Sequence, residues 1–220
     1  MSRISPGERA AEQRALLDAA ALVFDRRGFV GASVKDLADE TSTTVRAIKR
    51  HFGSKEGVAR AVVDEQNRRM VAALDTALLR HGPLEALIHA SRAMADLLTS
   101  DPTVRAGVRL TMELAACDPA VAGQFRGWVD QVAGLFERAK EAGDVVDRLD
   151  PTELGATFVA YFTGVHTLAA VLGEHDELPA RLVVMWRTVI DGAAPLGRRL
   201  GLHAVTRDAF GGWEEFLGAA

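Results

Sequence analysis

The sequence predicts an all-α protein, and three observations support this fold class. Apolar residues recur at three- and four-residue steps along most of the 220 residues, whereas strict alternation of apolar and polar residues is hardly seen. Asp-Pro pairs stand at positions 101–102, 118–119 and 150–151, where the carboxylate can cap a helix and proline suits its first turn. A Ser-x-x-Asp pattern at residues 33–36 marks a further helix start.

The first helix is expected to present one apolar face and to end at a glycine. Leu17, Ala20, Ala21 and Phe24 share that face, because they are spaced by three or four residues. Gly28 follows one turn later and can end the helix as a left-handed cap.

Two short helices separated by a polar turn follow over residues 33–52. Ser33 is expected to cap the first of them, and Thr43 or Thr44 the second. Their inward-facing residues are Val34, Leu37 and Ala38 in the first, and Val45, Ile48 and Phe52 in the second. This spacing is typical of a helix-turn-helix, so residues 1–60 are predicted to form a three-helix domain of that kind.

The remaining residues, 61–220, are expected to form a larger helical domain. A fourth helix begins near Ser54 and runs into this domain without a flexible joint. The later helices are predicted near 83–99, 102–116, 119–142, 151–172 and 179–200, with a last short one over 205–217.

Composition favours a globular protein of a reducing compartment. Apolar residues make up 48% and charged residues 25%, and no apolar run approaches the ~18 residues of a membrane span. No signal peptide is recognised at the N-terminus, and the single Cys117 excludes an intramolecular disulfide. We therefore expect a cytoplasmic protein that does not contact membranes.

Charge is unevenly distributed along the chain. Residues 1–60 hold 11 Lys/Arg against 8 Asp/Glu, whereas residues 61–220 hold 15 against 22, within a net charge of −4. A basic N-terminal part on an acidic body suits a modular DNA binder, because only one part must approach phosphate.

The second helix of the helix-turn-helix carries the candidate DNA contacts. Arg46, Lys49 and Arg50 share its outward face, where Arg can read guanine in the major groove and Lys can neutralise phosphate. The residues placed to reach flanking phosphates are Ser33, Thr43, Thr44 and Lys55, and Arg3 and Arg9 could form a basic arm. Considered alone, an Arg-Lys-Arg face is more often just a solvated surface.

Residues 8–62 resemble the N-terminal domain of TetR-type repressors. The matching strings are Phe24-Asp25-Arg26-Arg27-Gly28-Phe29, Ser33-Val34-Lys35-Asp36-Leu37-Ala38 and His51-Phe52-Gly53-Ser54-Lys55-Glu56-Gly57-Val58. The resemblance implies operator binding through the helix-turn-helix. The sequence departs from the family pattern in the turn (Thr41-Ser42-Thr43-Thr44), at Arg46 in place of glycine and at Lys49 in place of tyrosine.

The larger domain is similar to the γ-butyrolactone receptor branch of these repressors. The resemblance rests on Arg109-Leu110-Thr111-Met112-Glu113-Leu114, the region of Trp128 to Gly143, and Tyr161-Phe162-Thr163-Gly164-Val165. It implies a homodimer that leaves DNA when it binds a small signalling molecule such as a γ-butyrolactone, butenolide or furan. Pairing is expected through the helices near 151–172 and 179–200, which carry broad apolar faces.

The resemblance places three residues at the ligand: Gln66, Trp128 and Thr163. Trp128 offers an aromatic plate and an N–H donor, and Thr163 and Gln66 offer polar groups. Each has an ordinary alternative, as a core tryptophan, a helix-bonded hydroxyl and a surface amide.

The sequence holds no catalytic motif, metal-ligand spacing or cofactor fingerprint, so we expect neither an enzyme nor a resident metal or cofactor. Two alternatives remain open beside the ligand-responsive repressor: a ligand-blind pseudo-receptor with a scaffold body, and a broad-specificity drug-sensing repressor.

Overall fold

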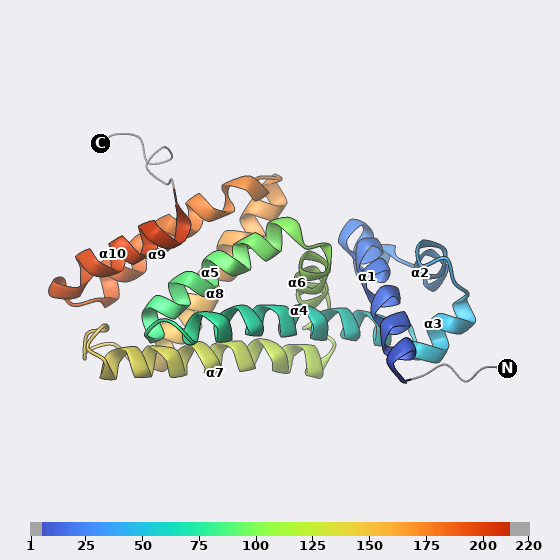
Figure 1. Ribbon diagram of the computed structural model, residues 1–220, viewed down its shortest axis with the longest axis horizontal. Helices are drawn as coiled ribbons and strands as arrows, with labels where there is room; N and C mark the ends of the chain where they lie inside the picture. Colours follow the sequence, from blue (N-terminus) through green and yellow to red (C-terminus); the bar gives the residue numbers. More distant parts are fainter. Residues whose placement is uncertain (1–5, 212–220) are drawn as a thin grey trace. The chain divides into compact units, whose positions relative to one another are not determined.

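The structure is a computed structural model that describes residues 6–211, and this part of the chain contains helices and no strand (Figure 1). The helices are α1 (Pro6–Gly31), α2 (Val34–Glu40), α3 (Val45–Phe52), α4 (Lys55–Leu78), α5 (Pro83–Ser100), α6 (Pro102–Leu114), α7 (Pro119–Glu141), α8 (Pro151–Leu172), α9 (Leu178–Ala193) and α10 (Leu196–Phe210), with a 3-10 turn η1 (His175–Glu177) before α9. The all-α prediction is therefore confirmed.

The chain divides into two compact units. The N-terminal unit comprises residues 1–69 and 100–124, and the C-terminal unit comprises residues 70–99 and 125–220. The N-terminal unit thus contains the helix-turn-helix together with α6, which begins 50 positions after the end of α3. These units differ from the segments 1–60 and 61–220 expected from the sequence, because α6 packs against α1.

The core of the N-terminal unit joins α1, the helix-turn-helix, the start of α4 and α6. Phe24, Leu37 and Ile48 are fully buried in it, and Ala106 and Leu110 of α6 are buried in the same cluster. The apolar face predicted for the first helix is confirmed, since all four of its residues are buried. On α3, in contrast, Val45 is exposed rather than inward-facing, because it stands at the first position of the helix, next to the turn.

The predicted helix caps are observed. Ser33 and Asp36 form a reciprocal capping box at the start of α2, and the Thr44 hydroxyl oxygen accepts the Ala47 N–H at the start of α3. Asp101 and Asp150 cap α6 and α8 ahead of their prolines. These side chains satisfy backbone donors that a helix start leaves without partners, which is why the helices begin where they do.

Gly28 interrupts the first helix, although in a different conformation from the left-handed cap that the sequence predicts. Its φ of 67° and ψ of −175° lie in a backbone region that is essentially restricted to glycine. Three residues beyond Gly28 complete α1 before Ser33 begins α2. The direction of α2 therefore depends on this break.

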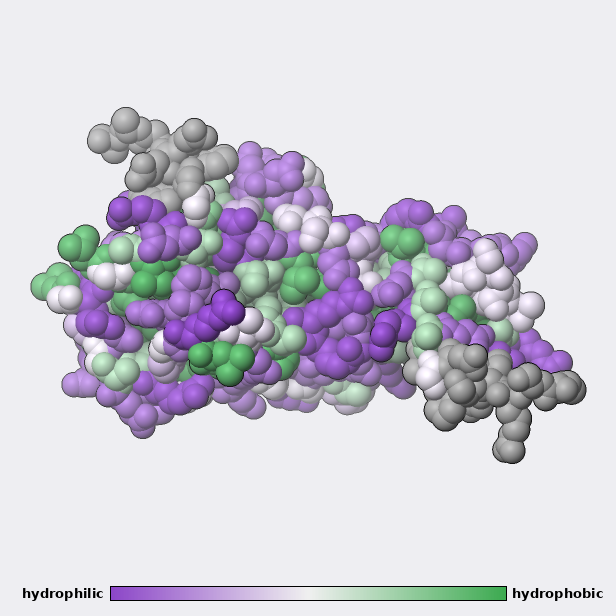
Figure 2. Space-filling view, viewed as in Figure 1, coloured by the Kyte–Doolittle hydropathy of each residue, from purple (hydrophilic) through white to green (hydrophobic). Residues whose placement is uncertain are grey.

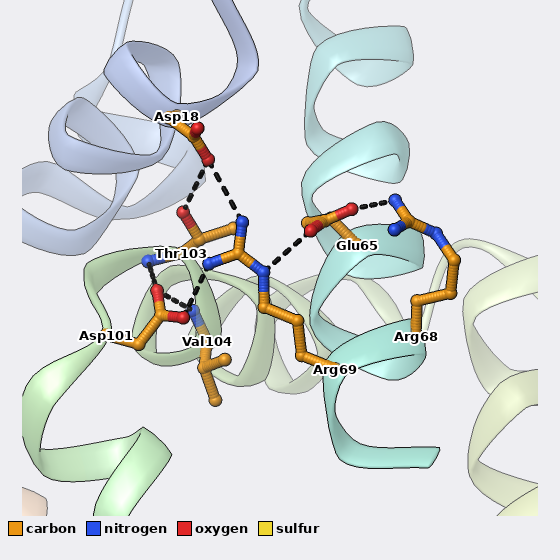
Figure 3. A network of polar contacts seen from close by, with 7 residues as sticks. All are labelled: Asp18, Glu65, Arg68, Arg69, Asp101, Thr103 and Val104. Carbon is orange, nitrogen blue, oxygen red and sulfur yellow. Dashed lines mark hydrogen bonds and ion pairs between the residues drawn. The ribbon is translucent and has the colours of Figure 1, made fainter. Parts of the chain in front are cut away.

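An ion-pair network within the N-terminal unit joins α1, α4 and the start of α6 (Figure 3). Arg69 stands at its centre, with contacts of 2.6 Å to Glu65, 2.5 Å to Asp101 and 3.1 Å to Asp18. Arg68 pairs with the other oxygen of Glu65. Because Asp101 also caps α6, this network fixes the start of that helix.

The core of the C-terminal unit forms around one fully buried tryptophan. The indole N–H of Trp186 donates to the Ser91 hydroxyl over 2.7 Å, so its single polar group is satisfied. Phe158 packs between Trp186 and Phe136, with ring centroids 5.1 and 5.8 Å away. These contacts join α5, α7, α8 and α9 of this unit in a common core.

The predicted helix over 179–200 is wrong, since two helices occupy this region. α9 ends at Ala193, and Ala194 takes an extended conformation with ψ of 144°, as favoured before a proline. Pro195 then precedes α10, which runs to Phe210. Of the short helix predicted over 205–217, residues 205–210 belong to α10 and residues 212–217 lie outside the described part.

The exposed apolar side chains of the C-terminal unit lie mainly on α8 and α10. Val171 on α8, and Leu196 and Leu200 on α10, are 77%, 82% and 79% exposed, and Figure 2 shows hydrophobic surface where α10 begins. α8 is also the one described helix that is long and apolar enough to cross a membrane by length and composition. The apolar face of α9, including Leu182 and Trp186, is instead buried within its own unit.

Candidate functional site

The candidate DNA interface is the outward face of α3. Ile48 is fully buried on the opposite face and fixes the rotation of the helix. Arg46, Lys49 and Arg50 are consequently all exposed, as the helical period predicts. Among the described residues, neither Arg46 nor Lys49 has an ion-pair partner, so both cations remain available to an external anion.

The hydroxyls predicted to meet phosphate differ in their surroundings. Ser33 donates its O–H to Asp36 over 2.7 Å while accepting the Asp36 N–H, so its hydroxyl is occupied by the capping box. That contact also lowers the pKa of the Asp36 carboxyl, because hydrogen bonds from Ser33 stabilise the charged form. Thr44 is exposed with its oxygen acting as the cap of α3, and Thr43 is half-buried in the turn.

Lys55 has intramolecular partners that the sequence did not suggest. Its ammonium donates to the carbonyl oxygens of Phe29 and Ala32, each over 2.9 Å, and lies 4.2 Å from the centre of the Phe29 ring. Lys55 therefore binds the last turn of α1 and the residue that follows it. A phosphate would have to share the ammonium with these two carbonyls.

Glu12 is a residue at this interface that the sequence reasoning missed. From α1 its carboxylate lies 3.8 Å from the Arg50 guanidinium and 3.5 Å from the His51 ring. Arg50 also lies 3.4 Å from the ring nitrogen of its neighbour His51. The carboxylate balances part of the basic face, and it could not be foreseen because α1 and α3 meet only in the folded unit. Arg3 and the side chain of Arg9 lie outside the described residues.

The three predicted ligand residues occupy different environments. Gln66 is buried on α4, where Gly107 of α6 packs against its side chain so closely that a Cβ at Gly107 would overlap it. Trp128 on α7 and Thr163 on α8 are both half-buried in the C-terminal unit. Gln66 is thus not the surface amide of the alternative interpretation, and Trp128 is not a fully buried core residue.

His166, on the same helix as Thr163, has a strongly shifted pKa. Burial lowers it from 6.5 to about 4, since the charged ring would lose its hydration. The folded protein therefore holds a neutral ring between pH 4 and 6.5, whereas the unfolded chain gains a proton over this range.

We expect His166 to make the protein less stable as the pH falls from 7 to 5. The unfolded state binds more protons in this window, so the free energy of unfolding should decrease by about 2 kcal/mol from this residue. Urea unfolding of the wild type and of His166→Gln at both pH values measures the effect. Equal losses in the two proteins would contradict it.

Two protein-family descriptions match the chain, and they account for the fold and the basic helix together. Residues 16–62 match bacterial regulatory proteins of the tetR family, and residues 81–195 match a tetracyclin repressor-like C-terminal domain. The chain belongs to the TetR family of transcriptional regulators.

The sequence and structural relatives point to one branch of the TetR family. The A-factor receptor protein of Streptomyces griseus is 29% identical over 191 residues, which are 84% of this chain and 64% of that protein, so the chain spans less than two thirds of its length. A crystal structure of a γ-butyrolactone receptor (ArpA-like protein) superimposes with a TM-score of 0.76 at 26% identity, covering 92% of this chain and 98% of that one.

A third relative was solved with DNA. CprB from Streptomyces coelicolor, in complex with its biological operator sequence, superimposes with a TM-score of 0.73 at 27% identity, covering 91% of this chain and 97% of that chain. The present chain is thus a TetR-type regulator related to γ-butyrolactone receptors.

Proposed function

We propose that this protein is a cytoplasmic repressor that binds operator DNA as a homodimer and is released by a small signalling molecule such as a γ-butyrolactone, butenolide or furan. The observation that carries DNA binding is the exposed pair Arg46 and Lys49 on a helix that Ile48 anchors in the core. The relative CprB supports the same role, since it was solved with its operator.

Pairing of two copies is proposed through α8 and α10. Both helices expose large apolar side chains, Leu168 and Val171 on α8 and Leu196 and Leu200 on α10. Clusters of exposed large apolar side chains often mark protein–protein interaction sites. This assignment replaces part of the expected 179–200 helix, because α9 uses its apolar residues within its own unit.

Ligand binding is proposed to use Gln66, Trp128 and Thr163. Gln66 is buried although it is polar, and Trp128 and Thr163 keep part of their surface accessible. An aromatic plate with a few polar groups suits a small lactone or furan. The size and chemistry of the ligand follow from the named relatives rather than from these three residues.

The proposed function is tested with promoter fragments from neighbouring genes and a panel of γ-butyrolactones, butenolides and furans. We expect the protein to retard one fragment in a gel and a member of the panel to release it. Failure to bind any fragment would contradict repression. Binding that no member of the panel releases would favour a ligand-blind regulator, and release by unrelated apolar drugs would favour a broad-specificity sensor.

Replacement of Trp128 by Ala should raise the ligand concentration needed for release by at least about 100-fold, because the aromatic plate and its N–H donor are both lost. Trp128→Phe keeps an aromatic ring but loses the N–H donor, so it should raise the ligand concentration needed for release by about tenfold. Titrations of ligand into a labelled protein–DNA complex measure both values. Equal release by the wild type and Trp128→Ala would contradict a ligand role for Trp128.

A further inference from the structure

The last turn of α1 and the residue after it, residues 29–32, are held by two other helices of the N-terminal unit. On one side, the Phe29 N–H donates to a carboxylate oxygen of Glu113 on α6 over 2.6 Å. On the other side, Lys55 at the start of α4 donates to the carbonyls of Phe29 and Ala32. One short segment therefore receives a carboxylate from α6 and an ammonium from α4.

The carboxylate of Glu113 is itself fixed in place. Arg109, one turn earlier on α6, donates to its other oxygen over 2.8 Å and to the carbonyl of Asp25 over 3.0 Å. Gly28 leaves the necessary room, since a Cβ there would lie 2.5 Å from the Glu113 carboxylate and 2.6 Å from the Arg109 guanidinium. Arg105 adds paired contacts to the Asp25 carboxylate.

The ammonium of Lys55 is also held in place by several contacts. Its ammonium lies over the Phe29 ring at 4.2 Å, and that ring stacks on Phe24 in the core with centroids 6.4 Å apart. The aromatic face favours the cation, and the two carbonyls take two of its three donors. Lys55 thus ties the first turn of α4 to the end of α1.

The held segment leads directly into the helix-turn-helix. Ser33, the residue after Ala32, is the N-cap of α2, and α2 packs against α3. The position of residues 29–32 therefore sets where α2 starts, and through α2 it sets where α3 lies within the unit.

We propose that Glu113 and Lys55 act as a two-sided clamp that positions the helix-turn-helix for operator binding, so that Glu113 of α6 is a positioning residue although it is not part of the DNA face. The inference rests on the proposed operator binding. It also assigns Lys55 a role that does not require contact with phosphate.

Glu113 gives a test in which the clamp and simple electrostatics predict opposite results. Loss of a negative charge from a DNA-binding unit favours DNA, because phosphate is no longer repelled. Loss of the clamp weakens binding, because the Phe29 N–H loses its charged acceptor and the segment loosens. Glu40 on α2 provides the matched control, since it carries the same charge as Glu113. Its carboxylate lies 2.5 Å from the Arg26 guanidinium and has no contact with Phe29 or Lys55 among the ion pairs of the described residues.

The experiment compares the full-length wild type with Glu113→Gln and Glu40→Gln. We expect Glu113→Gln to bind a wild-type operator fragment about tenfold more weakly in fluorescence anisotropy, and Glu40→Gln to bind as tightly as the wild type or more tightly. Unchanged or tighter binding by Glu113→Gln would overturn the clamp.

Amide hydrogen exchange of the protein without DNA provides a second measurement, independent of operator binding. Glu113→Gln and Lys55→Met should each accelerate exchange across residues 29–36 by about tenfold, whereas Glu40→Gln should leave the amides of residues 29–32 unchanged. If Lys55 served phosphate alone, Lys55→Met would exchange like the wild type, which would overturn its half of the clamp. A wild type that binds no DNA fragment would refute the proposed function, while this exchange measurement would still decide the clamp.

Discussion

The double substitution Arg46→Ala/Lys49→Ala is expected to abolish retardation of the operator, lowering its affinity by at least about 100-fold. Each chain would lose one side chain able to reach a guanine edge and one able to neutralise phosphate, and a dimer would lose both twice. Neither side chain has an ion-pair partner among the described residues, so the fold should not change. Gel retardation and sedimentation of the variant measure binding and assembly.

A matched control removes two exposed arginines from the C-terminal unit. Arg126→Ala/Arg187→Ala changes the net charge by the same amount and is expected to alter affinity only slightly. The dependence of affinity on salt adds a second criterion, since the α3 variant should show a shallower slope and the control should not. Wild-type affinity in the α3 variant would refute α3 as the DNA-contacting helix.

Gly28→Ala is expected to destabilise the protein by roughly 2–4 kcal/mol. The new Cβ would meet the Glu113 carboxylate and the Arg109 guanidinium, and alanine avoids the backbone conformation that Gly28 adopts. For a chain of this size the unfolding midpoint should fall by roughly 5–10 °C. Differential scanning calorimetry measures the change.

Gly123→Ala is the control for this substitution. Gly123 also belongs to the N-terminal unit, but it lies within α7 and a Cβ there would meet nothing within 4 Å. Alanine suits a helix interior better than glycine, so this variant should be as stable as the wild type or up to about 1 kcal/mol more stable. A midpoint for Gly28→Ala equal to that of Gly123→Ala would contradict the strain at Gly28.

Local chemistry allowed the sequence to predict much of the fold. The capping box of Ser33 and Asp36 and the caps at Asp101 and Asp150 involve residues within a few positions of one another, so their spacing is visible in the chain. The rotation of α3 followed from its helical period, which placed Arg46 and Lys49 outward.

Long-range contacts explain what the sequence did not predict. Nothing in the spacing of residues shows that Glu113 meets the amide of Phe29 across 84 positions, or that Glu12 lies beside Arg50. Lys55 was expected at phosphate because it follows a basic helix, yet its partners are the carbonyls of Phe29 and Ala32 at the end of α1. In the C-terminal part of the chain, apolar residues continue at helical spacing past Pro195, so the sequence predicted one helix where α9 and α10 are separate.

The membership of α6 in the N-terminal unit bears on how related regulators can be recombined. A graft of residues 1–62 onto the body of a relative would leave behind Arg105, Arg109 and Glu113, the partners of Asp25 and Phe29. A chimera that also carries residues 100–124 keeps these contacts. The same arrangement delays completion of the unit during synthesis, because some 30 further residues must leave the ribosome before α6 can join α1.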